Sequence, residues 1–161
     1  MYVSELNSKI VNMDFILDVD GVLTDGSFLY SKEGKIYKKF GPHDAYSLKK
    51  LSKVINISFI SADSRGFEIT KKRIDDMGFE VKLVSEEERY EYIVKNYNLE
   101  SLIYMGDGDA DARLLKESFK GIAPNNARPL ALKSADFVTN NVGASGAVAE
   151  ACDWIVDNLI N

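Results

Sequence analysis

The sequence predicts an α/β fold: a Rossmann-like parallel sheet with helices on both faces and a β-hairpin inserted after the first strand. Short apolar runs rich in strand-forming residues alternate with amphipathic helical patterns, which is typical of βαβ units. The chain has 161 residues, 45% of them hydrophobic, and it contains no internal repeat or low-complexity linker. We therefore predict a single domain over residues 1–161 with one proper core.

The expected elements alternate along the chain. Strands are expected at 14–19, 55–60, 80–84, 101–105 and 120–123, with a short one at 136–139. Helices are expected at about 45–53, 66–77, 88–96, 110–118, 127–133 and 146–159. The first, second and fourth strands rest on the apolar runs Phe-Ile-Leu at 15–17, Ile-Ser-Phe-Ile at 57–60 and Leu-Ile-Tyr-Met at 102–105.

The segment between the first strand and the first helix predicts a hairpin at about 27–40. Two runs that contain aromatic residues, 28–30 and 36–40, flank a turn that ends in Gly34. The aromatic side chains are expected to be exposed. They indicate either a flap or a contact with another subunit.

The charge and composition exclude several classes of partner. The formal net charge is −5. This argues against nucleic acids and anionic membranes as main partners, because a protein binds them through a basic face. The single cysteine, Cys152, cannot form an internal disulfide, and the amino-terminal segment lacks the pattern of a signal peptide. No apolar run approaches the roughly 20 residues that span a bilayer. We expect a cytoplasmic protein with a small-molecule substrate.

Two carboxylates one residue apart, Asp18 and Asp20, follow the first strand and precede Gly21. At the carboxyl end of a strand in an open α/β sheet, such side chains lie where ligands bind. Neighbouring carboxylates repel each other, so a hard cation such as Mg²⁺ usually holds them. The alternative interpretation is an Asp-Gly turn after a core strand.

Polar residues also follow two later strands. Ser61 ends the second strand, where a hydroxyl can donate to a phosphate oxygen, although Asp63 or Ser64 could instead cap the next helix. Asp107, Asp109 and Asp111 follow the fourth strand. Their Asp-x-Asp-x-Asp spacing resembles the start of a calcium loop, but Ala112 and Ser118 occupy the positions of its required glycine and glutamate.

Residues 18–26, Asp-Val-Asp-Gly-Val-Leu-Thr-Asp-Gly, resemble the first motif of the haloacid dehalogenase superfamily. The Leu-Thr-Asp-Gly extension resembles its capless branch, which contains 3-deoxy-manno-octulosonate 8-phosphate phosphatases and acylneuraminate 9-phosphate phosphatases. The likeness spans nearly the whole chain. It implies a fold without a separate cap domain, a Mg²⁺ cofactor, and a homotetramer built through the hairpin.

The resemblance also implies roles for the motif residues. Asp18 is the nucleophile and Asp20 the general acid and base. Ser61 and Arg89 bind phosphate. The metal is held by Asp18, the backbone carbonyl of Asp20, and Asp107, with Asp111 as a supporting acid. The role of Asp109 stays open.

Several positions depart from the family pattern or have competing interpretations. Arg89 stands where relatives have lysine; it could instead be a solvated helix residue paired with a nearby glutamate, and Lys82 or Lys95 could take its role. His43, Asp44 and Arg65 are candidate substrate contacts, although Asp44 could simply cap a helix. Ala144 and Ala149 replace a glycine and an arginine of relatives.

The resulting hypothesis is a Mg²⁺-dependent phosphatase that acts through an aspartyl-phosphate intermediate. Its expected substrate is a sugar phosphate, an eight- or nine-carbon keto-acid sugar of lipopolysaccharide or sialic acid synthesis. Two alternatives remain open. One is a non-catalytic, phosphatase-like oligomerisation module of nucleotide-sugar synthesis, and the other is a phospho-acceptor switch domain.

Overall fold

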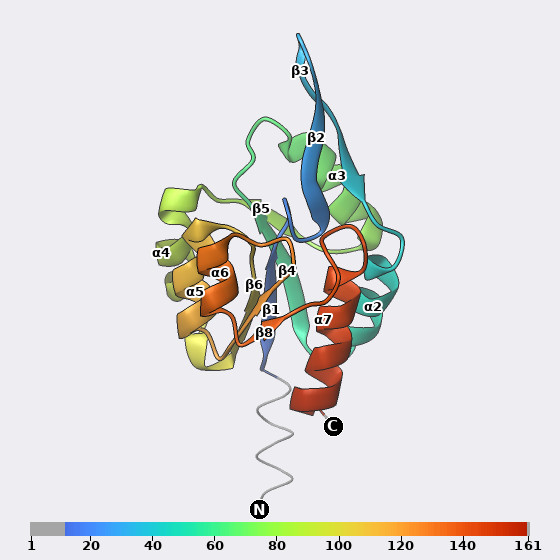
Figure 1. Ribbon diagram of the computed structural model, residues 1–161. Helices are drawn as coiled ribbons and strands as arrows, with labels where there is room; N and C mark the ends of the chain where they lie inside the picture. Colours follow the sequence, from blue (N-terminus) through green and yellow to red (C-terminus); the bar gives the residue numbers. More distant parts are fainter. Residues whose placement is uncertain (1–11, 161) are drawn as a thin grey trace, which may run out of the picture.

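The computed structural model describes residues 12–160 and has a parallel six-stranded sheet at its centre (Figure 1). The strand order is β5-β4-β1-β6-β7-β8. These strands are β1 (Asp14–Asp18), β4 (Asn56–Ser61), β5 (Val81–Leu83), β6 (Leu102–Met105), β7 (Lys120–Ala123) and β8 (Phe137–Val138). The six strand predictions and the fold class are confirmed.

Helices cover both faces of the sheet. They are α2 (Asp44–Leu51), α3 (Phe67–Met77), α4 (Glu86–Asn96), α5 (Ala112–Glu117), α6 (Pro129–Ser134) and α7 (Ala147–Ile155). Short helical turns are η1 (Leu99–Ser101), η2 (Asp109–Asp111) and the π-helical η3 (Val156–Ile160). The structure splits the helix expected at 110–118 into η2 and α5, and α7 continues as η3.

Alternate residues of β1 face two separate hydrophobic clusters. Phe15 and Leu17 pack with residues of α2, α3 and α7 on one face of the sheet. Ile16 packs with residues of α4, α5 and α6 on the other face. Because successive side chains of a strand point to opposite faces, β1 is buried on both sides. Its carboxyl end is therefore held rigidly, and Asp18 is its last residue.

The predicted hairpin is β2 (Thr24–Ser31) and β3 (Gly34–Phe40), an antiparallel pair that projects beyond the sheet (Figure 1). It begins three residues earlier than expected, inside the first motif. Large apolar side chains lie exposed along it: Phe28, Leu29, Tyr30, Ile36 and Tyr37. None of the helices between residues 12 and 160 has the length and apolar character needed to cross a membrane.

Ala144 has an unfavourable backbone conformation, and we expect Ala144→Gly to stabilise the protein. Its φ of 62° makes it the one non-glycine residue with positive φ between residues 12 and 160. Glycine adopts the left-handed conformation without strain, although its greater freedom in the unfolded chain offsets part of this gain. The free energy of unfolding should therefore rise by up to about 1 kcal/mol in total. Urea unfolding measures the change. Ala149→Gly, inside α7, is the control and should lower it by about 1 kcal/mol. A loss of stability in Ala144→Gly would contradict the interpretation.

Candidate active site

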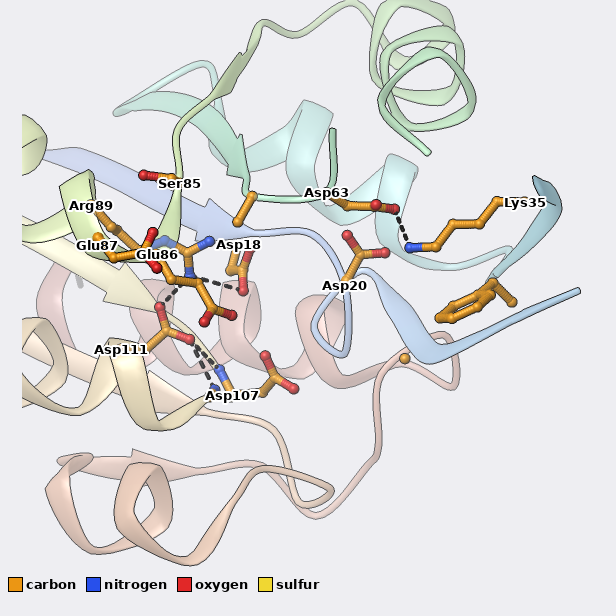
Figure 2. Close-up of a pocket in the computed structure, with 14 residues that line it drawn as sticks. Asp18, Asp20, Lys35, Asp63, Ser85, Glu86, Glu87, Arg89, Asp107 and Asp111 are labelled. Carbon is orange, nitrogen blue, oxygen red and sulfur yellow. Dashed lines mark hydrogen bonds and ion pairs between the residues drawn. The ribbon is translucent and has the colours of Figure 1, made fainter. Parts of the chain in front are cut away.

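A cavity of about 530 Å³ opens at the carboxyl ends of the central strands, beside the hairpin (Figure 2). Its charged lining consists of seven carboxylates and two cations: Asp18, Asp20, Asp63, Glu86, Glu87, Asp107, Asp111, Lys35 and Arg89. Residues from β1, the hairpin, the loop after β4, α4 and the loop after β6 thus meet in one place. This is the position at which open α/β sheets bind ligands.

Three carboxylates form a compact cluster in this cavity. Oxygen atoms of Asp18, Asp107 and Asp111 all lie within 4.8 Å of one another. Asp111 is fully buried and accepts hydrogen bonds from the Tyr104 hydroxyl and from the backbone N–H groups of Asp107 and Gly108. Carboxylate oxygens are the ligands that hard divalent cations prefer, so the cluster fits Mg²⁺.

Arg89 provides the one cation in contact with this cluster among the described residues. Its Nη1 donates to Asp111 Oδ1 at 2.6 Å and to Asp18 Oδ2 at 3.1 Å, and its Nη2 donates to Asp18 Oδ1 at 3.3 Å. The residue is only 3% exposed. The alternative of a solvated residue paired with a glutamate of α4 is therefore wrong. Arg89 instead holds both oxygens of the Asp18 carboxylate from the first turn of α4.

The cluster carries more negative than positive charge, and this affects proton binding. Burial raises the pKa of Asp18 well above its usual range; Arg89 opposes this, and Asp111 and Asp107 reinforce it. Burial and the Asp111 carboxylate together raise the pKa of Asp107 to about 7. Without a divalent cation, the site therefore retains protons near neutral pH, and cation binding competes with them.

We expect the metal-free protein to lose stability as the pH rises from about 4 to about 7. In this window folded Asp107 holds a proton that the unfolded chain, with a pKa near 3.9, has already released. The effect is at most roughly 4 kcal/mol. Melting temperatures in EDTA at pH 5 and pH 8 measure it, and Asp107→Asn should reduce the difference between them. Added Mg²⁺ should stabilise the wild type more at pH 8 than at pH 5; equal stabilisation at both would contradict this assignment.

Asp20 lies beside Asp18 on the hairpin side of the cavity (Figure 2). Ser61 is fully buried, and its hydroxyl donates to Asp20 Oδ2 at 3.3 Å while accepting from the backbone N–H of Asp63 at 3.2 Å. Ser61 therefore stands at the strand end as predicted, but its hydroxyl holds the Asp20 carboxylate. Its phosphate-binding role stays a prediction.

Three residues that the structure places in the site were not assigned to it from the sequence. They are Lys35 and Lys38 from β3, and Asp63 from the loop after β4. Lys35 Nζ lies 2.7 Å from Asp63 Oδ2, and Lys38 Nζ lies 2.8 Å from Asp63 Oδ2 and 2.8 Å from Asp20 Oδ1. These contacts lower the pKa of Asp63 to about 2 against the opposing effect of its burial. The alternative interpretation, in which Asp63 or Ser64 caps the next helix, is wrong, because the N-cap of α3 is Gly66 and has no side-chain hydrogen bond.

The candidate substrate contacts lie outside the cavity lining. His43 is exposed at the N-cap of α2, and Arg65 is exposed before α3. Asp44 is buried and accepts from the backbone N–H of Ala149, so it joins α2 to α7 and does not cap α2. Their substrate roles receive no support from these positions.

Other candidates also lie apart from the acid cluster. Lys82 and Lys95 line a separate hollow beside β5 and α4, so neither replaces Arg89. Asp109 is exposed and pairs with Arg128 at 3.3 Å. Asp109 therefore does not belong to the cluster of Asp18, Asp107 and Asp111.

The parallel sheet and the carboxylates at its strand ends are typical of the haloacid dehalogenase-like hydrolases, and comparisons with known proteins agree with this class. Residues 82–151 match the family model described as haloacid dehalogenase-like hydrolase. The chain is 30% identical over 149 residues to the 3-deoxy-D-manno-octulosonate 8-phosphate phosphatase KdsC of Escherichia coli K12, covering 88% of this chain and 77% of the relative. The Haemophilus influenzae KdsC is 30% identical over 159 residues, with 94% and 87% covered.

Solved structures of such phosphatases share the fold. The Moraxella catarrhalis enzyme, in complex with a magnesium ion, a phosphate ion and a KDO molecule, has a TM-score of 0.81 and 25% identity, covering 96% of this chain and 91% of its own. The cobalt-bound Haemophilus influenzae enzyme has a TM-score of 0.78 and 29% identity, with 92% and 90% covered. The chain therefore belongs to the haloacid dehalogenase-like hydrolases, in the family of the 3-deoxy-D-manno-octulosonate 8-phosphate phosphatases, which are phosphoric monoester hydrolases.

Proposed function

We propose that this chain is a Mg²⁺-dependent phosphatase that hydrolyses a sugar phosphate monoester through an aspartyl-phosphate on Asp18. The observation that carries the proposal is the state of Asp18: Arg89 holds both of its oxygens at the end of β1, and Asp107 and Asp111 lie within 4.8 Å. A carboxylate fixed in this way is suited to in-line attack on phosphorus.

We also propose that residues 1–161 form a single domain.

In the proposed mechanism, each residue has a separate task. Asp18 attacks phosphorus, and Arg89 keeps its carboxylate aligned and offsets its charge. Ser61 and Arg89 also hold oxygens of the substrate phosphate. Asp20 protonates the leaving alcohol and later activates the water that hydrolyses the acyl phosphate. Bound Mg²⁺, held by Asp18, Asp107 and the Asp20 backbone carbonyl with Asp111 in support, would neutralise phosphate charge. Phosphoryl transfer depends mainly on such positioning and charge neutralisation.

For the substrate, we propose an eight-carbon keto-acid sugar phosphate, which the names of the KdsC relatives support. A nine-carbon acid of the sialic acid type rests on the first-motif resemblance alone. The exposed apolar side chains of the hairpin support assembly through it, and we propose a homotetramer. A role in lipopolysaccharide synthesis in the cytoplasm follows from the proposed substrate.

Phosphate release from a panel of sugar phosphates, including eight- and nine-carbon keto-acid phosphates, tests the function. We expect turnover that requires Mg²⁺ and that EDTA abolishes. The panel ranks the substrates, and a simple hexose phosphate serves as the control for selectivity. Absence of turnover on every compound would overturn the proposal in favour of a non-catalytic module. A long-lived phosphoprotein would favour a phospho-acceptor switch.

A further inference from the structure

The side chain of Lys38 is fully buried between the hairpin and the body of the protein, with 0% of its surface exposed. Its Nζ lies 2.8 Å from Asp20 Oδ1, 2.8 Å from Asp63 Oδ2 and 2.8 Å from Thr70 Oγ1. An ammonium group has three N–H donors, so each has a partner. A buried lysine with this arrangement is costly unless every partner is in place.

The Asp20 carboxylate is thereby held through both oxygens. Ser61 donates to Oδ2, and Lys38 binds Oδ1. Asp20 itself is 34% exposed at the cavity, so without these contacts its side chain would be free to turn. Figure 2 shows Asp20 beside Asp63 and Lys35, on the hairpin side of the site.

Gly66 permits this arrangement. A Cβ atom at this position would lie 2.4 Å from Asp63 Oδ2 and 2.7 Å from Lys38 Cε, closer than real contacts allow. The start of α3 therefore approaches the two side chains closely enough to confine them. Lys35, on the same strand as Lys38, also binds Asp63 Oδ2, at 2.7 Å.

We propose that Lys38 is a positioning residue that fixes the Asp20 carboxylate toward the leaving-group oxygen, so that the hairpin controls proton delivery. This inference rests on the proposed phosphatase function. Lys38 lies on β3, and Asp20 lies in the loop after β1, so a displacement of the hairpin moves the proton carrier. Small misplacements of a catalytic group can reduce rates by about 10²-fold.

The test compares leaving groups. An alkyl or sugar alcohol needs a proton as it departs, whereas p-nitrophenolate departs without one. Lys38→Met should therefore lower kcat/KM about 10²-fold on the preferred sugar phosphate and less than about 3-fold on p-nitrophenyl phosphate. Because kcat/KM reports only steps up to phosphoryl transfer to Asp18, the later use of Asp20 as a base does not enter. Asp20→Asn gives the reference pattern of selective loss.

The matched control is Lys39→Met, on the same strand. Lys39 is 68% exposed, and its Nζ lies 3.7 Å from Asp25 Oδ2. Its replacement should therefore leave kcat/KM unchanged on both substrates. If Lys38→Met does not fold, Gly66→Ala provides a second route, because its methyl group displaces Lys38 and Asp63 without removing a charge. We expect the same selective loss. Equal losses on both substrates, or none, would overturn the inference, whereas an inactive wild type would overturn the proposed function itself.

Discussion

Asp18→Asn should lower kcat on the order of 10⁴-fold or more, while the protein remains folded. The amide has nearly the shape of the carboxylate but does not attack phosphorus. Burial already disfavours the charged form of Asp18, since it raises the pKa of this group, so loss of the charge should not destabilise the fold. Arg89 keeps Asp111 as a partner at 2.6 Å. Phosphate release in the presence of Mg²⁺ measures the loss.

Stability provides the control for this variant. The melting temperature of Asp18→Asn in EDTA should equal or exceed that of the wild type. A second check is acid-stable trapping of radioactive phosphate on the protein, which should be absent in Asp18→Asn. Retention of even a tenth of the wild-type activity in a folded variant would show that Asp18 is not the nucleophile.

The strand ends explain why much of the site could be predicted. Asp18 and Ser61 follow an apolar run directly, and Asp107 follows one after Gly106. Parallel strands bring their carboxyl ends together at one edge of the sheet. The order of strands places β1 between β4 and β6, so these three residues become neighbours. Local pattern and topology were sufficient here.

The hairpin residues could not be predicted in the same way. Lys35 and Lys38 lie in a segment of mixed aromatic and basic residues, which indicates a hairpin but not its position over the body. Their contacts with Asp63 are long-range in sequence and depend on the packing of α3 against β3. The one available signal was Asp63, a carboxylate after the Ser61 strand end, and the sequence suggested only a possible helix cap for it.

Arg89→Met should produce the second large effect, on stability as well as activity. The substitution leaves Asp18, Asp107 and Asp111 clustered without a guanidinium, and breaking a buried ion pair costs about 3–5 kcal/mol. Arg89 opposes the rise in the pKa of Asp18 and of Asp107. Without it, the folded protein binds protons more tightly, so the loss should be larger at pH 8 than at pH 5. Urea unfolding in EDTA measures it at both values.

The comparison with Mg²⁺ separates the charge of Arg89 from its geometry. A divalent cation that neutralises the same carboxylates should restore much of the stability of Arg89→Met, but kcat should stay about 10²–10³-fold low because the nucleophile is no longer aligned. Arg89→Lys keeps the charge without the fork that spans Asp18 and Asp111. Its stability and kcat should therefore lie between those of the wild type and those of Arg89→Met. Arg113→Met is the control: this arginine is 61% exposed and pairs with Glu117, so its loss should cost less than about 1 kcal/mol. If Arg89→Met were as stable as this control at pH 8 in EDTA, the guanidinium would not be what allows three acids to meet at the end of β1.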